Sequence, residues 1–196
     1  MKKSWIIIGV IVVLVFIIYR LFAGSYNNMV TKDEDVKSQW AQVENVYQRR
    51  ADLIPNLVST VKGYAEFEKS TLTEVVQARA SATSVKIDAN NLSPENIAKF
   101  QQAQDGLSGA LSRLLVSVEK YPDLKANQNF LELQAQLEGT ENRIAVERGR
   151  FNEMVQLYNK YIRSFPNNIF AGFYNFEKKG YFEAVKGADK APEVKF

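Results

Sequence analysis

The chain has 196 residues, 46% of them hydrophobic and 24% charged, a composition typical of a folded protein. It has no histidine and no cysteine, which excludes disulfides, thiol nucleophiles and imidazole-based acid–base chemistry, and removes the usual ligands of zinc. Of the 25 basic residues, Lys2, Lys3 and Arg20 flank an apolar N-terminus; the other 22 match the 22 acidic residues, so the rest of the chain offers no basic footprint for nucleic acid.

The first predicted element is a membrane-spanning helix over residues 5–23, after a tail over residues 1–4. The run from Trp5 to Tyr19 carries no charge, and Arg20 can extend to the lipid headgroups. With the three apolar residues that follow, the segment is long enough to cross a hydrocarbon core of about 30 Å. Trp5 and Tyr19 stand at its ends, where aromatic rings prefer the interface.

A cleaved signal peptide is the alternative for this segment, with residues 23–25 as a small-residue cleavage site. Arg20 interrupts the approach to that site, and the apolar run is long for such a peptide, so we favour an uncleaved single-pass anchor. The two lysines of the tail favour a cytoplasmic N-terminus, which places the bundle on the periplasmic or extracellular side. Basic residues that follow the span nearly balance this argument, so the opposite orientation stays open.

One long helix is predicted from Val36 to about Ser84. Its apolar residues recur at alternating spacings of four and three, which indicates one buried seam. Pro55 interrupts the pattern, yet the register continues on both sides of it. A kinked but continuous helix explains that continuity better than two separate helices.

Two further helices follow. Ser93 and Pro94 open the second as N-cap and first helical residue, and Pro122 ends it. The third runs from Asn127 to about Phe165, before a Pro-Asn-Asn stop. No strand-like alternation of useful length occurs.

The expected fold is therefore all-α. An antiparallel bundle over residues 24–186 combines three long helices with a short C-terminal helical and aromatic segment, and is thus of four-helix type. Residues 187–196 are expected to form a loose tail. The aromatic segment either packs over the end or a groove of the bundle, or contacts lipid or a partner protein. The residues expected to make that external contact are Phe170, Phe173, Tyr174 and Phe176.

No catalytic, metal or cofactor site is predicted. Carboxylate-bound di-metal centres in helical bundles use Glu-x-x-His pairs, which a chain without histidine lacks. Glycine-rich phosphate loops are absent, and only a chance Ser–Lys pairing remains for nucleophilic catalysis. We therefore expect a protein that is not an enzyme and that binds no cofactor.

Charged residues on the helical seams are the first candidate sites. Arg50 and Glu68 fall on the seam of the first helix, and Arg148 on that of the third. A straight helix drifts by about 20° per heptad, which would carry these residues to the surface. Alternatively they form an interhelical ion pair that fixes the register, or a polar pocket with a function.

Three blocks of the sequence stand out in order along the chain. They are residues 48–58 with Val61-Lys62-Gly63-Tyr64, residues 121–130, and residues 139–145 with Arg150-Phe151-Asn152, Tyr158-Asn159 and Phe165-Pro166. In this order the blocks resemble the bacterial LemA family, and the resemblance covers nearly the whole chain. It implies a four-helix-type bundle on one anchor in a bacterial cell (inner) membrane. It implies no catalytic residues, because the family has no established biochemical activity.

Two of these blocks contain further candidate sites. Pro55 frees the carbonyl of Ala51, which Asn56 or Arg50 could satisfy, or which could recruit a ligand. Gly139 in the middle of a helix costs about 1 kcal/mol relative to alanine. A close helix crossing explains it, and the alternative is a polar ligand or partner site made of Glu141, Asn142 and Arg143.

Three functional hypotheses follow. The first is a membrane-anchored scaffold or adaptor of the cell envelope, which contacts the bilayer through residues 5–23 and binds a membrane or envelope protein through a helical face. The second is a self-assembling or membrane-shaping protein, with homo-oligomer or lipid contacts through the first helix and the aromatic C-terminal region. The third is an unrecognised enzyme or sensor with a polar pocket at Arg50, Glu68 and Arg143.

Overall fold

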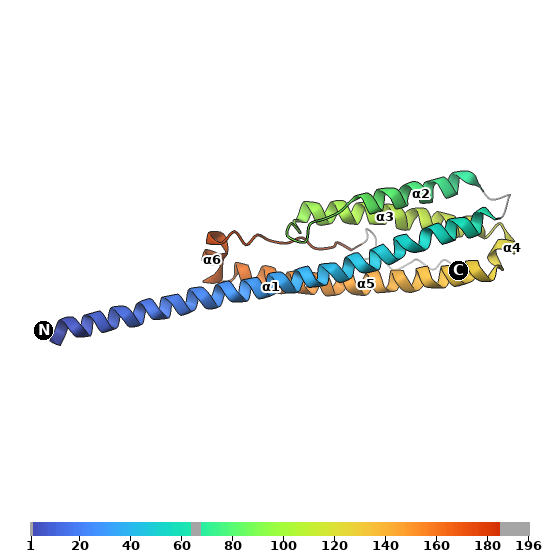
Figure 1. The fold of residues 1–196 in the computed structure, drawn as a ribbon. Coiled ribbons are helices and arrows are strands. Elements are labelled where there is room, and N and C mark those ends of the chain that lie inside the picture. The colour runs from blue at the N-terminus through green and yellow to red at the C-terminus, as the bar shows by residue number, and fades with distance from the viewer. Residues whose placement is uncertain (1, 64–67, 185–196) are drawn as a thin grey trace, which may run out of the picture.

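The computed structural model describes residues 2–63 and 68–184, and within these ranges the chain is all-helical, with no strand. The all-α prediction is confirmed. Figure 1 shows the long helices packed side by side, with one of them extending far beyond the others. The helices are α1 (Lys2–Lys62), α2 (Lys69–Ser84), α3 (Pro94–Val118), α4 (Pro122–Lys125), α5 (Gln128–Arg163) and α6 (Asn167–Phe173).

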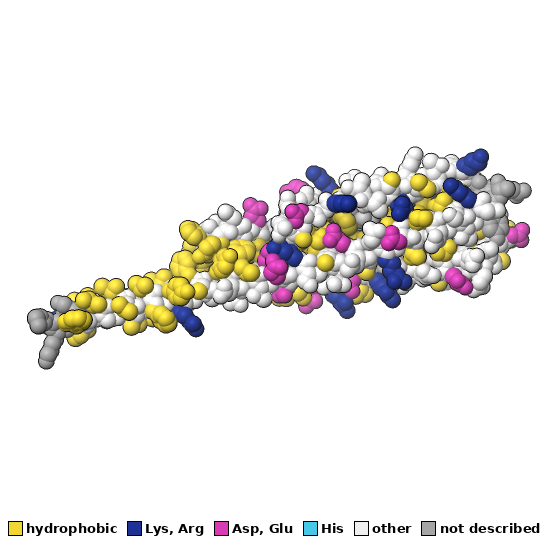
Figure 2. All heavy atoms as spheres, viewed as in Figure 1, with side chains coloured by type: hydrophobic (Ala, Val, Ile, Leu, Met, Phe, Trp, Pro, Cys, Tyr) yellow, Lys and Arg dark blue, Asp and Glu magenta, His cyan; other side chains and the backbone are white. Residues whose placement is uncertain are grey.

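Helix α1 is continuous from the apolar N-terminal segment into the bundle. It has 61 residues, which corresponds to a length of about 90 Å at 1.5 Å per residue. It is the one helix among the described residues that is long and apolar enough to cross a membrane, and none of its most apolar stretch is buried by the described parts of the chain. Figure 2 shows this end as a narrow, almost wholly apolar stalk that leads into a body with mixed charges.

The expectation of one kinked helix from residue 36 to residue 84 was wrong. Helix α1 passes through Pro55 without ending and stops at Lys62, and α2 then runs back along it (Figure 1). The turn begins at Gly63, whose N–H donates to the carbonyl of Thr60 at 3.3 Å, and glycine is the residue that most readily ends a helix. The fourth helix of the bundle is therefore α2, and not the C-terminal aromatic segment.

The starts of α3 and α5 are as predicted. The side chain of Ser93 accepts a hydrogen bond from the N–H of Asn96, and that of Asn127 accepts one from the N–H of Phe130. Each cap satisfies one of the free N–H groups in the first turn, worth about 1 kcal/mol relative to alanine.

The core has two hydrophobic clusters along the bundle. The one nearer the apolar stalk includes Trp40, Phe100 and Phe151, and the one farther away includes Leu57, Leu107 and Phe130. Helix α1 packs mainly on α5, and α2 on α3, while α3 and α5 approach each other less closely. The expected loose tail over residues 187–196 lies outside the described residues.

Candidate functional site

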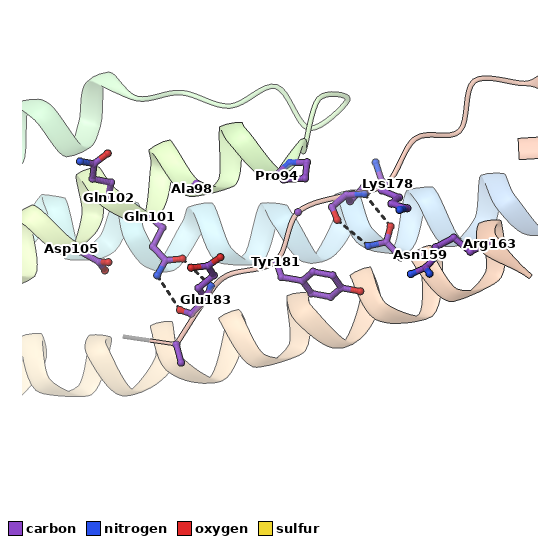
Figure 3. Close-up of a pocket in the computed structure, with 13 residues that line it drawn as sticks. Pro94, Ala98, Gln101, Gln102, Asp105, Asn159, Arg163, Lys178, Tyr181 and Glu183 are labelled. Carbon is purple, nitrogen blue, oxygen red and sulfur yellow. Dashed lines mark hydrogen bonds between the residues drawn. The ribbon is translucent and has the colours of Figure 1, made fainter. Parts of the chain in front are cut away.

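The space between α3 and α5 is a groove, and the chain itself fills the half of it nearer the stalk. After α6, residues 175–184, here called the strap, return along the bundle as an extended segment. Figure 3 shows the strap lying between the two helices. An opening of about 640 Å³ beside it is lined by Pro94 and Gln101 of α3, by Asn159 and Arg163 of α5, and by the strap.

Side-chain amides hold the strap through its backbone. Three of them each donate to a strap carbonyl and accept from the N–H of the same strap residue, with all six distances between 2.8 and 3.0 Å. An amide side chain has the donor and acceptor of a peptide group, so it pairs with an extended backbone much as a neighbouring strand would. The pairs are Asn159 with Lys179, Asn152 with Phe182 and Gln101 with Glu183.

One charged pair fixes the strap to α1. The Nζ atom of Lys179 lies 2.7 Å from a carboxylate oxygen of Asp33 and 5.2 Å from the ring centre of Tyr158. Burial raises the pKa of Asp33, but hydrogen bonds from Lys179 and Lys37 outweigh it, so the pKa lies below its ordinary value. Burial likewise raises the pKa of Tyr158, whose hydroxyl donates to the carbonyl of Glu177 at 2.9 Å.

Close packing fixes the remainder of the strap. Phe182 is buried in the nearer cluster, with its ring centre 5.5 Å from that of Phe151. The guanidinium of Arg148 lies 4.8 Å from the centre of the Phe182 ring and donates to the carbonyl of Glu183 at 2.7 Å. Gly180 passes so close to α3 that an added Cβ would lie 2.6 Å from the Cα of Pro94. The strap is thus an integral part of the folded bundle.

The far half of the groove contains no strap. An opening of about 500 Å³ there is lined only by α3 and α5 among the described residues. Leu111, Leu115 and Leu137 give it an apolar wall, and Glu141 and Asn142 give it a polar edge.

A buried polar layer separates the two hydrophobic clusters beneath this groove. Arg50 is 1% exposed, and its Nη1 donates to Glu141 at 2.6 Å and to Ser108 at 2.7 Å. Its Nη2 donates to the side chain of Gln104 at 2.8 Å, and Gln104 in turn donates to the carbonyl of Ala82 at 3.2 Å. The layer therefore joins α1, α2, α3 and α5. The expectation that the drift of the helix carries Arg50 to the surface was wrong. The alternative is confirmed, because Arg50 forms an interhelical ion pair with Glu141.

The other charged candidates lie elsewhere. Glu68 is exposed at the start of α2, with a carboxylate oxygen 3.8 Å from the Nζ of Lys120. Arg143 is exposed on α5. Neither is among the hydrogen-bonding partners of Arg50, so the pocket expected at Arg50, Glu68 and Arg143 is not formed; Arg148 instead holds the strap.

The carbonyl freed by Pro55 has a partner that the sequence did not reveal. The Nε of Arg79 in α2 donates to the carbonyl of Ala51 at 2.8 Å. Asn56 is exposed, and the terminal nitrogens of Arg50 are engaged in the polar layer, so the expected partners were wrong. This bond joins α2 to α1. The carbonyl that Pro55 leaves free therefore takes part in helix packing.

The aromatic segment packs at the end of the bundle nearest the stalk. Phe170 is buried, with its ring centre 4.3 Å from that of Phe22. Tyr174 and Phe176 lie 4.8 Å and 6.0 Å from the ring of Tyr26. The prediction that the aromatic segment packs over the end of the bundle is therefore correct for Phe170, Tyr174 and Phe176. Phe173, in contrast, is 75% exposed.

The groove between α3 and α5 presents groups that pair with the backbone of the strap. No group of three or more acidic side chains within the described ranges could hold a metal ion. The groove instead offers amide pairs, an apolar wall and charges of both signs. Sequence reasoning missed Gln101, Asn152 and Asn159, although the last two lie within the blocks that carry the family resemblance.

Comparison with known proteins gives one family. Residues 39–196 match the family described as LemA. Magnetosome protein MamQ 2 of Paramagnetospirillum magneticum is 27% identical over 93% of this chain and 73% of its own length. Protein LemA of Metamycoplasma hominis is 24% identical over 79% of this chain and 67% of its own. Magnetosome protein MamQ of Magnetospirillum gryphiswaldense is 26% identical over 84% of this chain and 66% of its own length. None of these names is that of an enzyme.

Proposed function

This chain is a membrane-associated protein that belongs to the LemA family, and from that membership and its architecture we propose that it is a non-enzymatic scaffold or adaptor of the bacterial cell envelope. Residues 5–23 anchor it by a single pass, and the bundle faces the periplasm or the exterior. Its partner is another membrane or envelope protein, bound through the face formed by α3 and α5.

The groove between α3 and α5 is the observation that carries this proposal. Its near half already holds an extended segment by pairing between side-chain amides and the backbone of that segment, which supports the binding of a second peptide chain by the same helices. Its far half has the same two walls, an apolar lining and no occupant among the described residues. A partner segment that extends the path of the strap would cover the half-buried Leu115 and meet the polar edge at Glu141.

The continuity of α1 supports an uncleaved anchor. Ser25 is the last residue of the alternative cleavage site at residues 23–25. Its side chain is buried and donates a hydrogen bond to the side chain of Asn167 at 2.7 Å. Loss of the first 23 residues would also remove Phe22, on which Phe170 packs. The continuous helix would hold the bundle at a fixed height above the membrane, as a scaffold requires.

Site-specific photo-cross-linking in native membranes tests the proposal. A photoreactive residue at Leu115 lies in the far groove, and one at Val76, an exposed apolar position of α2, serves as the control. We expect Leu115 to capture one envelope protein in stoichiometric yield and Val76 to capture none. Capture of a second copy of this chain alone would favour self-assembly instead, and equal capture at both positions would contradict a specific face.

A further inference from the structure

The end of the bundle nearest the stalk carries exposed aromatic residues that the folded chain does not need. We define the foot as residues 164–176 together with Phe22 and Tyr26. Phe165 is 82% exposed, Phe173 75% and Ile169 59%. Ile169 and Phe173 lie one turn apart on α6, so they share a face. A neighbouring face of α6 packs on α1 through Phe170.

The position of the foot along α1 sets its depth. Trp5 to Phe22 is about 26 Å of helix, close to the hydrocarbon thickness of a bilayer. With Trp5 at one interface, Phe22 therefore lies just inside the other. The ring contact between Phe22 and Phe170 places α6 at that same level. Figure 2 shows apolar side chains gathered at this junction between stalk and body.

The composition of the foot matches that depth. No charged residue occurs between Arg163 and Glu177, nor on α1 between Arg20 and Lys32, although 24% of the whole chain is charged. Both segments that meet in the foot are thus free of charge over the same stretch of the molecule. The amphipathic rings of tyrosine and tryptophan prefer the headgroup region of a bilayer, and the foot contains Tyr26 and Tyr174.

We propose that the foot inserts Phe165, Ile169 and Phe173 into the interface of the membrane that α1 crosses. Two elements then fix the bundle to one leaflet: the span itself and α6 beside it. A lone helix would leave the bundle free to tilt relative to the membrane normal. The second contact holds one side of the bundle against the lipid, and so sets the tilt of the bundle and the angle of the groove between α3 and α5 to the membrane plane. This inference rests on the proposed anchor but not on the proposed partner.

Spin labels on the full chain in phosphatidylcholine vesicles test this contact directly. The chain has no cysteine, so single substitutions label one position each. Phe173→Cys reports on the foot, Val15→Cys on the span and Val116→Cys, 69% exposed at the far end of α3, on the aqueous side. All three positions are exposed, so folding is not at risk. Collision rates with oxygen and with a water-soluble nickel complex measure the depth of each label.

We expect the ratio of oxygen to nickel collisions at residue 173 to be several-fold higher than at residue 116 and to approach the ratio at residue 15. A ratio at 173 equal to that at 116, with residue 15 in the bilayer, would overturn the foot and leave the anchor intact. Protection of residue 173 from both reagents, with spin–spin broadening that dilution removes, would assign this face to a second copy and overturn the lipid contact. An aqueous residue 15 would overturn the anchor and the foot together.

Discussion

The two partners of the buried ion pair should differ in the cost of their removal. Glu141→Ala leaves the Arg50 guanidinium, 1% exposed, with only neutral acceptors. Breaking a buried pair in this way costs about 3–5 kcal/mol. The Glu141 side chain is 42% exposed and water can enter beside it, so we expect about 2–3 kcal/mol, below that range.

Arg50→Met should cost less. The Glu141 carboxylate returns to water, and Ser108 keeps its hydrogen bond to the carbonyl of Gln104. The Oε1 atom of Gln104 is then the acceptor that loses its partner, at a cost of about 1–2 kcal/mol. Arg50→Met combined with Glu141→Ala should be about as stable as Arg50→Met alone. Removal of the arginine is therefore expected to rescue part of the damage caused by Glu141→Ala.

Denaturant unfolding of the full chain in detergent micelles measures these differences. The chain has two tryptophans, so a Trp5→Phe background leaves the buried Trp40 as the single fluorescent reporter of the core. The free energies of unfolding of the two single variants and the double variant are compared with that of the background protein. The predicted difference between the two partners would be refuted if Arg50→Met lowered the free energy of unfolding as much as Glu141→Ala does. It would also be refuted if the losses of the two single variants added up in the double variant.

Two further predictions concern the strap. Because the pKa of Asp33 is lowered in the folded protein, its pairing with Lys179 stabilises the strap above about pH 4 and is lost as the pH falls through the lowered value. The protection factors of amides 179–183 against hydrogen exchange should fall there, whereas Asp33→Asn should lower them already at neutral pH and abolish the acid step. Gly180→Ala must displace the start of α3 at Pro94 and should lower both the unfolding midpoint and the same protection factors, whereas Gly172→Ala, with nothing within 4 Å of the new Cβ, should do neither.

Much of the fold could be predicted because local chemistry determines it. Ser93 and Asn127 cap helices wherever a helix begins beside them, and the apolar spacing of α3 and α5 leaves one face to bury. The turn after Lys62 could not be predicted from the same pattern, because a seam keeps its spacing whether the chain continues or reverses. Gly63 was the one local signal of a helix end.

The strap and the polar layer escaped prediction for a different reason. An extended segment held by side-chain amides has no period of its own, since its partners Asn152 and Asn159 belong to the periodicity of another helix. Arg50 stood out as a charge on a seam, but its partners depend on which helices lie opposite it. Those neighbours follow from the reversal at Gly63.

We propose that one helix crosses the membrane and continues as the first helix of the bundle. Single cysteines at Lys3 and Val116 test it with a membrane-impermeant thiol reagent, since the chain has no other thiol. With the cytoplasmic membrane intact and any outer membrane permeabilised, Val116→Cys should react at once and Lys3→Cys only after lysis. Reaction of both from the same side would contradict the span, and with it the account of how the bundle is held.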